Sequence, residues 1–464
     1  MVVVYKSGRA KAPTALLTAL AAFNVVSSIG CIKLVNGMLL PAARIGTRHG
    51  WGGIRRFRWH WGAERSTVTS IECGERSSSN SQASVETGSN NLWSIPECLD
   101  HWTKLQNGTA AEEDRLPSIR FVDATWFHKG ERDGRREFEA GPRLPGAFHW
   151  DIADLATTGE LFPEDNPKGL KNIFPPEWLV GAALERMGVL PDDFESNSGN
   201  SYSGGGGGGD DGPTLVVYGR NGTRFAPRVW YMLKKYYRGG SVRLLQGSLE
   251  EWERQGGLVE TEPLGSDGSG HRTLRARDLV EFIDDDDDDN DDDNDNNDDN
   301  DDSSRGLHPW ISSDARDRLV DMSFVLDLLE RQQQQQLRAD GPSLIIDTRG
   351  SSFAQKGHIP GAIHVPYASL SLPDDPTTLL SRDDLERVLT DALGDDALDR
   401  LAERPPLLSC GTGVSVCTMA LVLDELGLPE PWIYDGSWDE WGKDPSTPKA
   451  GGVVSGGGGG GGGS

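Results

Sequence analysis

Short apolar runs alternate along the chain with longer stretches in which apolar residues recur at helical spacing. Pro213–Gly222 and Pro406–Ser409 hold continuous apolar runs bounded by Pro, Gly or polar residues, which is typical of buried strands. Ala226–Tyr237 and Val414–Leu426 follow them, and each places its apolar residues along one stripe of a helix. Strands and helices in this order favour an α/β fold, with a parallel sheet flanked by helices.

The same alternation extends over most of the chain from residue 92 to residue 446. The further elements that the pattern predicts are a helix in Leu92–Trp102, a strand in Ser118–Phe127 that ends near Asp123, a helix around Glu177–Met187, a strand and a helix in Val242–Trp252, and a helix that starts near Asp314.

Four motifs of the first half return in the same order in the second half, which indicates an internal repeat. The motif VDATW matches IDTRG, LPGAFHWD matches IPGAIHVP, LVVYG matches LLSCG, and QGSLEEW matches DGSWDEW. No Cys occurs between Cys98 and Cys410, so only the second half has a thiol in the LLSCG position. We therefore expect two tandem α/β domains, of which the first is structural and forms one wall of a cleft.

The net charge of −26 over 464 residues is concentrated in one run. Residues 284–302 contain fourteen Asp and no basic residue, and removing these fourteen negative charges leaves −12 for the rest of the chain. Such an acidic surface lacks the basic field that nucleic-acid binding requires. The run also lacks the spaced Gly and Glu of a calcium-binding loop, so we expect a solvated spacer.

Composition divides the chain into six segments. They are a targeting presequence in residues 1–63, a disordered linker in 64–91, a first domain in 92–258 with a disordered insert at 196–212, a linker with the acidic run in 259–307, a second domain in 308–446, and a Gly-rich tail in 447–464.

Residues 1–63 contain nine Lys or Arg and no Asp or Glu, which is typical of a targeting presequence. The apolar run Ala15–Val26 is too short and too interrupted to predict a transmembrane helix. The basic residues continue well past this run, which favours mitochondrial import. A plastid presequence and a disordered basic arm are the alternatives.

Cys410 lies where the strand Pro406–Ser409 meets the helix that follows, in the loop Cys-Gly-Thr-Gly. Backbone N–H groups that surround a thiol at a helix N-terminus stabilise a thiolate, and they stabilise a persulfide in the same way. The alternative is a small buried apolar cysteine. The five cysteines show neither a metal-ligand spacing nor a disulfide framework, so we expect no metal, no cofactor and a reducing compartment.

Four motifs of the second half together resemble the catalytic domain of the rhodanese family. They are SLIIDTRG (343–350), GHIPGAIHVP (357–366), CGTGVS (410–415) and PWIYDGSWDEW (431–441). The order is similar, more narrowly, to the two-domain 3-mercaptopyruvate and thiosulfate sulfurtransferases, over roughly residues 117–446 apart from the inserts. The resemblance implies two tandem rhodanese-like domains, each a parallel sheet flanked by helices.

The resemblance implies that Cys410 is a nucleophile that carries sulfane sulfur as a persulfide. Sulfur would pass from a small-molecule donor to cyanide or to a thiol, either a low-molecular-weight thiol or a thioredoxin-like protein. The neutral Gly411 and Thr412 after the cysteine favour 3-mercaptopyruvate over the thiosulfate dianion. Thr412 takes the position of the family's proton-relay hydroxyl, or else only braces the loop.

The rest of the loop completes the predicted substrate-binding set. Gly413 and Val414 contribute backbone, and Ser415 caps or braces the early helix. Arg349 matches the arginine that binds the donor carboxylate in the family. The alternative for Arg349 is an ion pair with Asp347 or a neighbouring residue.

Two departures from the family pattern concern the substrate. A second arginine usually follows the first, but here Ser351 or Ser352 stands near that place, with Lys356 or Arg220 as a replacement. Arg143 stands where family members commonly have the His of His-Ile-Pro-Gly, which removes a possible relay histidine.

Four more residues attract notice but have simpler interpretations. We expect His358 to orient its turn, Trp438 and Trp441 to lie in the core, and Cys417 to be a buried helix residue; a resolving thiol is the alternative for Cys417.

Three alternative functions stay open at this point. Thiosulfate:cyanide transfer needs only a different donor, and a non-enzymatic persulfide carrier needs only the fold. A cysteine phosphatase is disfavoured, because its loop needs an Arg where Val416 stands. For the enzyme we expect a monomer that binds neither nucleic acid nor a membrane.

Overall fold

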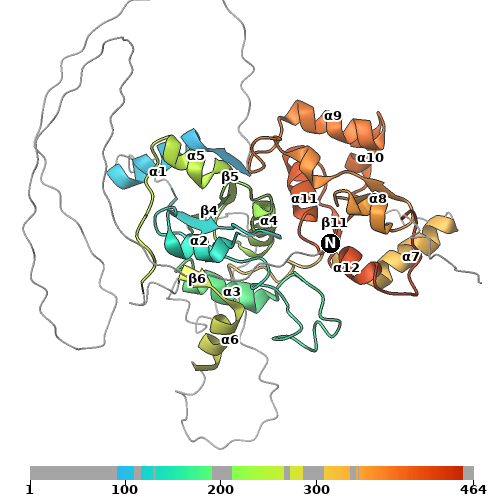
Figure 1. Cartoon of the computed structure of the whole chain (residues 1–464), viewed down its shortest axis with the longest axis horizontal. Coiled ribbons are helices and arrows are strands. Elements are labelled where there is room, and N and C mark those ends of the chain that lie inside the picture. The colour runs from blue at the N-terminus through green and yellow to red at the C-terminus, as the bar shows by residue number, and fades with distance from the viewer. Residues whose placement is uncertain are drawn as a thin grey trace, which may run out of the picture. The chain divides into compact units, whose positions relative to one another are not determined.

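The structure, a computed structural model, describes residues 91–108, 117–128, 132–190, 212–265, 272–285, 308–334, 341–342 and 344–452. The presequence and linker predicted before residue 91, most of the predicted insert, most of the acidic run and the end of the Gly-rich tail lie outside these residues. Two parallel sheets, each flanked by helices, make up the described chain (Figure 1). The predicted α/β fold class is thereby confirmed.

The first sheet has six parallel strands in the order β1-β5-β4-β2-β3-β6. They are β1 (Leu92–Ser94), β2 (Ile119–Asp123), β3 (Phe148–Trp150), β4 (Thr214–Gly219), β5 (Val242–Ser248) and β6 (Thr273–Leu274). Every residue of β4 is buried, because helices cover both faces of the sheet. This explains why β4 is a continuous apolar run rather than an alternating one.

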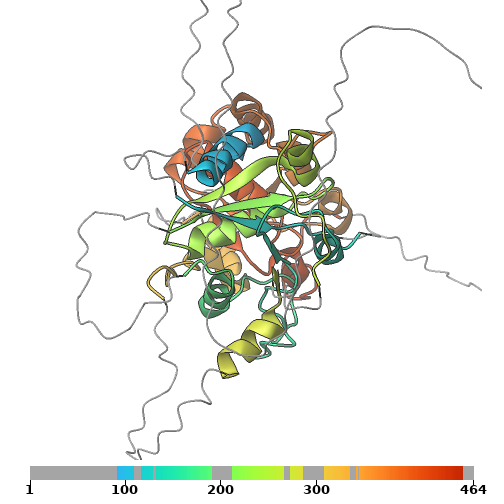
Figure 2. The same cartoon turned by 90° about the vertical axis from the view of Figure 1, so that its left-hand side faces the viewer.

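Six helices belong to this sheet. They are α1 (Ile95–Asn107), α2 (Gly134–Ala140), α3 (Glu177–Arg186), α4 (Ala226–Tyr236), α5 (Leu249–Arg254) and α6 (Ala276–Asp285). α1, α2 and α5 pack on the face that presents Phe121 and Val216, whereas α3 and α4 pack on the face that presents Val122 and Val217. Figure 2 shows α1 and α6 on opposite sides of the strands.

The structure corrects two predictions for this domain. Residues 92–94 form a strand rather than the start of a helix, because Ser94 caps α1 in a reciprocal capping box with Glu97 and leaves the preceding residues extended. β6 and α6 lie beyond the predicted boundary at residue 258, and β6 pairs with β3. The first domain therefore continues to at least residue 285.

The second sheet has five parallel strands in the order β7-β11-β10-β8-β9. They are β7 (Leu319–Val320), β8 (Ile345–Asp347), β9 (Ala362–His364), β10 (Leu407–Ser409) and β11 (Trp432–Tyr434). The helices are α7 (Met322–Gln333), α8 (Ser352–Lys356), α9 (Arg382–Leu393), α10 (Ala397–Glu403), α11 (Val416–Glu425) and α12 (Ser437–Trp441).

The ends of this second domain also differ from the prediction. α7 begins at Met322 rather than near Asp314, because the Asp321 carboxylate accepts a hydrogen bond from the N–H of Phe324 and caps the helix there. Ala450 forms an antiparallel bridge with His358, so the ordered chain passes the predicted boundary at residue 446.

The strand registers correct the internal alignment of the repeat by one residue. In the first sheet Asp123 pairs with Tyr218, and in the second sheet Asp347 pairs with Ser409. The position equivalent to Cys410 is therefore Gly219 and not Tyr218. Matching the glycines of LVVYG and LLSCG placed the two strands one residue out of step.

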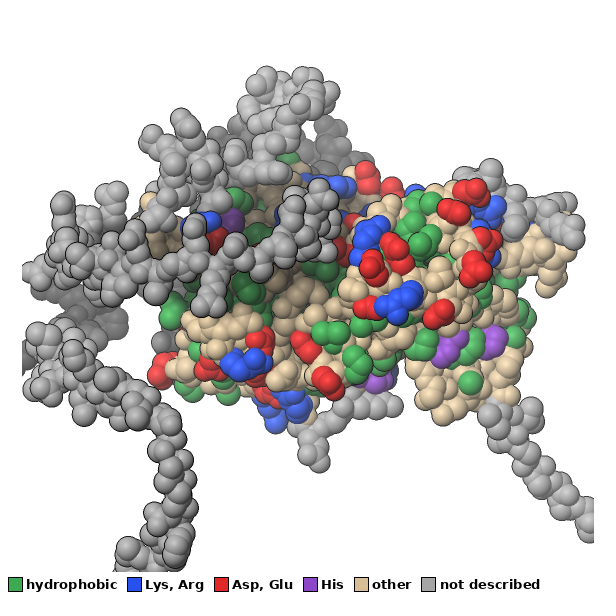
Figure 3. Space-filling view, turned by 90° about the horizontal axis from the view of Figure 1, so that it is seen from above, with side chains coloured by type: hydrophobic (Ala, Val, Ile, Leu, Met, Phe, Trp, Pro, Cys, Tyr) green, Lys and Arg blue, Asp and Glu red, His purple; other side chains and the backbone are tan. Residues whose placement is uncertain are grey.

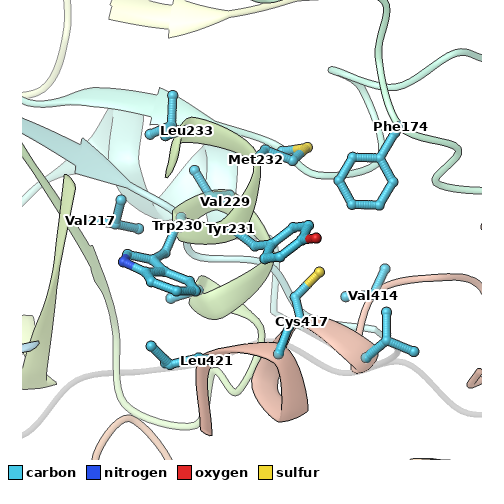
Figure 4. Close-up of a cluster of buried hydrophobic side chains, with 14 of the residues drawn as sticks. Phe174, Val217, Val229, Trp230, Tyr231, Met232, Leu233, Val414, Cys417 and Leu421 are labelled. Carbon is cyan, nitrogen blue, oxygen red and sulfur yellow. The ribbon is translucent and has the colours of Figure 1, made fainter. Parts of the chain in front are cut away.

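The two domains share one hydrophobic core. α4 of the first domain packs against α11 of the second, and the cluster around them reaches from Val217 in β4 to Ile433 in β11. Figure 4 shows Trp230 and Tyr231 of α4 facing Cys417 and Leu421 of α11. A contact of this kind, which is continuous and apolar, fixes the two sheets relative to one another.

On the face of the molecule in Figure 3, acidic and basic side chains are interspersed among the described residues. Among the described helices, none has both the length and the apolar composition that crossing a bilayer requires.

Candidate active site

Cys410 follows the last residue of β10, a central strand of the second sheet, and α11 begins six residues later. Its side chain is 2% exposed. The N–H of Cys410 donates to Ser437 Oγ at 3.1 Å, and its carbonyl accepts from the N–H of Trp438 at 3.0 Å. The start of α12 thus holds the turn at the carboxyl edge of the sheet, where α/β folds bind ligands.

The loop after Cys410 is a cradle of free backbone donors. No hydrogen bond within the described part of the chain uses the N–H of any residue from Gly411 to Ser415. Gly413 adopts a φ of 76°, and a Cβ there would lie 3.0 Å from the carbonyl oxygen of Asp435. Successive N–H groups at a helix N-terminus favour an anion, so the loop is suited to a charged sulfur.

A cavity of about 260 Å³ opens over Cys410. Its lining comes from both domains and consists of Trp126, His128, Phe225, Arg349, Gly350, Ser351, Ser352, Tyr367, Cys410, Gly411, Thr412, Val414 and Ser415. The rings of Trp126, Phe225 and Tyr367 form a continuous aromatic wall, with centroids 5.4 and 5.5 Å apart. The first domain therefore supplies part of the wall opposite the cysteine loop.

Arg349 lies at the cavity with most of its guanidinium already paired. Nε and Nη2 donate to the Asp347 carboxylate at 2.7–3.0 Å, and Nη2 also donates to the carbonyl of Gly357 at 2.8 Å. Nη1 is buried and has no hydrogen-bond partner among the described residues. Arg349 thus makes the predicted alternative, an ion pair with Asp347, and only Nη1 of its guanidinium is left without a partner among the described residues.

Thr412 is oriented by the first domain. Its Oγ1 accepts a hydrogen bond of 2.9 Å from Nδ2 of Asn172. Because the amide donates, the hydroxyl proton of Thr412 is available for a different acceptor. Ser415 makes no side-chain cap bond to α11, and its Oγ lies 3.0 Å from Oγ1 of Thr348. Ser415 therefore ties the loop to the end of β8.

Residues 329–444 match the model of the rhodanese-like domain. The second domain is thus similar to rhodanese-like domains over this range.

Curated relatives and a solved structure extend the match across both domains. The chain is 25% identical over 336 residues to thiosulfate/3-mercaptopyruvate sulfurtransferase 1, mitochondrial, of Arabidopsis thaliana, which covers 72% of this chain and 74% of the relative. It is 27% identical over 338 residues to thiosulfate/3-mercaptopyruvate sulfurtransferase 2 of the same plant, covering 72% and 82%. The crystal structure of the Tum1 protein of Saccharomyces cerevisiae superposes with a TM-score of 0.50 at 21% identity, over 76% of this chain and 94% of that one. The two tandem rhodanese-like domains are thus confirmed as the fold.

Arg143, which stands in the place of the family histidine, and the two replacements considered for the second arginine do not line the cavity. Arg143 is buried, pairs with Glu260 and donates to the carbonyls of Phe138 and Glu262. Arg220 donates to carbonyls of its own domain, and Lys356 is exposed at the end of α8. None of the three lines the cavity, so neither Lys356 nor Arg220 replaces the second arginine of the rhodanese pattern.

Four neighbouring residues have structural positions. His358 stacks on Phe353 at 4.1 Å, Trp441 is fully buried, and Trp438 lies 4.4 Å from the Arg349 guanidinium. Cys417 is fully buried against α4, and burial raises the pKa of its thiol to about 12 (Figure 4).

Three residues at the site escaped the sequence reasoning: Ser437, Asn172 and Arg228. Ser437 belongs to the repeated Gly-Ser pair of QGSLEEW and DGSWDEW, a signal that was available but that pointed only to the repeat. Asn172 and Arg228 belong to the first domain and reach the loop across the domain interface. No local pattern announces such contacts.

Proposed function

We propose that the chain is a sulfurtransferase that moves sulfane sulfur from 3-mercaptopyruvate to a thiol or cyanide acceptor through a persulfide on Cys410. The observation that carries the proposal is the position of Cys410, at the carboxyl end of a central strand and under free backbone N–H groups, at the floor of a cavity. The names of the two plant relatives support the reaction class.

The proposed reaction has two steps, in which Cys410 first accepts and then releases the sulfur atom. The Cys410 thiolate attacks the donor sulfur, so that a new S–S bond forms while the C–S bond breaks. The carbon leaves as the enolate of pyruvate and takes up a proton, for which the Thr412 hydroxyl is placed. An acceptor thiolate or cyanide then attacks the outer sulfur, the S–S bond breaks, and the thiolate of Cys410 returns. The loop N–H groups stabilise the negative sulfur in both resting forms.

The charge of the cavity supports the choice of donor. Among the described residues that line it, Arg349 and His128 are the basic ones, and Arg349 offers only Nη1. A donor with one carboxylate needs less positive charge than the thiosulfate dianion. The donor carboxylate is therefore assigned to Arg349, with Ser351 and Ser352 beside it.

The test is to measure steady-state kinetics with 3-mercaptopyruvate and with thiosulfate, and to measure the mass of the chain after exposure to donor alone. We expect a higher kcat/KM with 3-mercaptopyruvate, and a mass gain of one sulfur atom that Cys410→Ser abolishes. Cys417→Ala is the matched control, because it removes a thiol seven residues away that does not line the cavity. Unchanged turnover in Cys410→Ser would contradict the proposal.

A non-enzymatic persulfide carrier is the second candidate, because one of the two family arginines is absent and the other is largely engaged by Asp347. A carrier would take up one sulfur atom per chain and would then not turn over with any acceptor.

The proposal extends to the cell compartment. The basic residues 1–63 favour mitochondrial import with a plastid as the alternative, and one of the plant relatives is named as mitochondrial. A fusion of residues 1–90 to a fluorescent protein tests this, and a cytosolic signal would contradict both forms of the proposal.

A further inference from the structure

One buried arginine of the first domain is hydrogen-bonded to the cysteine loop of the second domain. Arg228 lies in α4, is 1% exposed, and stacks its guanidinium 3.3 Å from the centroid of the Phe174 ring. Nη1 donates to the carbonyl of Gly413 at 3.1 Å, and Nη2 donates to the carbonyl of Asn172 at 2.7 Å. The side chain therefore joins the loop to a second segment of its own domain.

Asn172 links Arg228 to the neighbouring loop residue Thr412. It adopts a left-handed φ of 58°, and its side-chain amide donates to Thr412 Oγ1 at 2.9 Å while its carbonyl accepts from Arg228. Two consecutive loop residues, Thr412 and Gly413, are thus fixed by two groups of the first domain that are themselves hydrogen-bonded. Removal of Arg228 would leave the Gly413 carbonyl without this partner and would loosen Asn172 as well.

The hydrogen bond to Gly413 sets the direction of the next N–H. A trans peptide group is planar, and its C=O and N–H point in opposite directions. Because the Gly413 carbonyl points toward the Arg228 guanidinium, the N–H of Val414 points away from that guanidinium, and Val414 lines the cavity together with Cys410. A rotated peptide would instead present a carbonyl oxygen to the sulfur anion, which repels it.

Several other charged and titratable groups surround the loop and also contribute to its electrostatic environment. Asp435 and Cys417 lie on the α4 side with Arg228, while Arg349, His128 and Tyr367 line the cavity. The Asp435 carboxylate accepts from the N–H of Phe174 at 2.9 Å, so it belongs to the same interface.

We propose that Arg228 is a positioning residue for sulfur transfer: it holds the Gly413–Val414 peptide in the orientation that stabilises the Cys410 thiolate and persulfide. The inference rests on the proposed function for its consequence in turnover. If this inference is right, the first domain is needed for catalysis although it has no thiol at the equivalent position, because it holds the cysteine loop of the second domain in place.

The experiment compares Arg228→Ala and Arg228→Lys with Tyr231→Phe. Tyr231 lies on the same helix, and its hydroxyl donates across the same interface to Glu430 at 2.9 Å without touching the loop. All three changes are made in the wild-type chain, and alkylation is followed on the peptide that contains Cys410, because Cys417 Sγ itself lies 3.9 Å from the Gly413 carbonyl oxygen. The readouts are the rate of Cys410 alkylation by iodoacetamide as a function of pH, kcat and KM, and the thermal midpoint of unfolding.

We expect Arg228→Ala to lower kcat by at least about tenfold and to shift the alkylation profile upward by about one pH unit. Arg228→Lys keeps the charge but not the two-pronged geometry, so it should fall between Arg228→Ala and wild type. Methylguanidinium added to Arg228→Ala should restore part of both losses. Tyr231→Phe should keep the wild-type profile even if its thermal midpoint falls.

A folded Arg228→Ala or Arg228→Lys protein with the wild-type alkylation profile would overturn the inference. If Arg228→Ala fails to fold, Arg228→Lys and Asn172→Ala decide by the same criterion. Alkylation needs no sulfur donor, so it tests Arg228 even if the wild-type chain proves inactive with both donors. Inactive wild type with a shifted Arg228 profile would reject the proposed function alone.

Discussion

The two domains place the same kind of turn at the same edge of the same kind of sheet, yet only one turn is open. After β10, no hydrogen bond among the described residues uses the N–H groups of Gly411–Ser415, and all of these residues except Gly413 line the cavity. After β4, the N–H of Asn221 donates to the Glu250 carboxylate at 2.9 Å, and the N–H of Thr223 donates to the carbonyl of Arg220. The first turn thus engages two of its donors, while in the second no N–H group from Gly411 to Ser415 has a partner among the described residues.

The buried acids at the strand ends show the same contrast. Asp123 at the end of β2 has His149 at 3.5 Å and Arg220 at 3.8 Å, and this cluster is closed inside the first domain. Asp347 at the end of β8 pairs with Arg349, a residue that lines the cavity and whose Nη1 has no partner among the described residues. The same fold therefore holds a closed, buried cluster of charged residues in the first domain and a candidate active site in the second. The side chains that follow the central strand determine which of the two is formed.

The most direct test of the difference between the two turns is to place a thiol in the turn of the first domain. Cys410→Ser should lower turnover by about a thousandfold or more, and Gly219→Cys added to it should restore none of that loss. A Cβ at Gly219 would lie 2.3 Å from Thr223 Cγ2, and the N–H groups of Asn221 and Thr223 are already engaged. Donor-dependent sulfur on the peptide that contains residue 219, seen by mass spectrometry, would contradict this.

The second prediction concerns the shape of the open turn, for which α11 supplies a matched pair of glycines. Gly413 precedes the helix with φ 76°, and Gly427 follows it with φ 72°. A Cβ at Gly413 meets Asp435 at 3.0 Å, whereas a Cβ at Gly427 meets nothing within 4 Å. Gly427→Ala should therefore cost about 1 kcal/mol of stability through its left-handed φ and leave turnover unchanged.

Gly413→Ala should carry the same backbone cost and also displace the N–H cradle. We expect kcat to fall by about tenfold or more, since a misplaced oxyanion-type donor costs that much or more in other enzymes. Unfolding in urea and steady-state kinetics separate the two effects. Equal kinetics in the two variants would mean that the cradle geometry is unimportant.

The sequence predicts the local part of this site because the local pattern is complete. An apolar strand, Cys410, two glycines and an apolar helix follow one another, and their spacing alone places a thiol at a helix N-terminus. The repeated motifs predict the second domain as well. The partners of the loop are a different matter, because Arg228 and Asn172 act across an interface between residues about 185 and 240 positions apart.

The other differences have equally specific causes. β6 has only two residues, which is too short for any period to appear, so the first domain seemed to end too early. Arg349 carries the family motif, but nothing in the motif says that Asp347 two residues earlier engages two of its nitrogens. The sequence shows which residue types are present at the site. Only the folded chain shows which hydrogen-bond partners those residues have.

A smaller effect is expected from restoring charge where the cavity lacks it. Ser351 lines the cavity, so Ser351→Arg should lower KM about two- to fivefold, with the larger change for the thiosulfate dianion. Gln355→Arg adds the same charge four residues later, in α8, at an exposed residue that does not line the cavity. Equal effects of the two variants would assign the change to long-range charge and not to the donor site.

The smallest expected effect concerns Asp435, which the repeat matches to the neutral Gln246 of the first domain. Burial raises the pKa of the Asp435 carboxyl, with the nearby Arg228 acting in the opposite direction. A raised folded-state pKa means that the folded chain holds this proton more tightly than the unfolded chain does. The contribution of Asp435 to stability is therefore fully present below the unfolded-state pKa and is lost as the pH rises through the folded-state value.

Asp435→Asn removes that loss, because an amide keeps an oxygen for the N–H of Phe174 and carries no charge into the interior. The free energy of unfolding of Asp435→Asn minus that of wild type should thus grow as the pH is raised from about 4 toward neutrality. Asp444→Asn is the control of opposite sign, because the hydroxyl and the N–H of Ser446 lower the pKa of the Asp444 carboxyl. The stability that Asp444 contributes is present above its unfolded-state pKa, so its variant should lose stability on the same rise in pH. Urea unfolding of both variants at a series of pH values measures the two slopes, and slopes of the same sign would refute the assignment of burial as the dominant influence on Asp435.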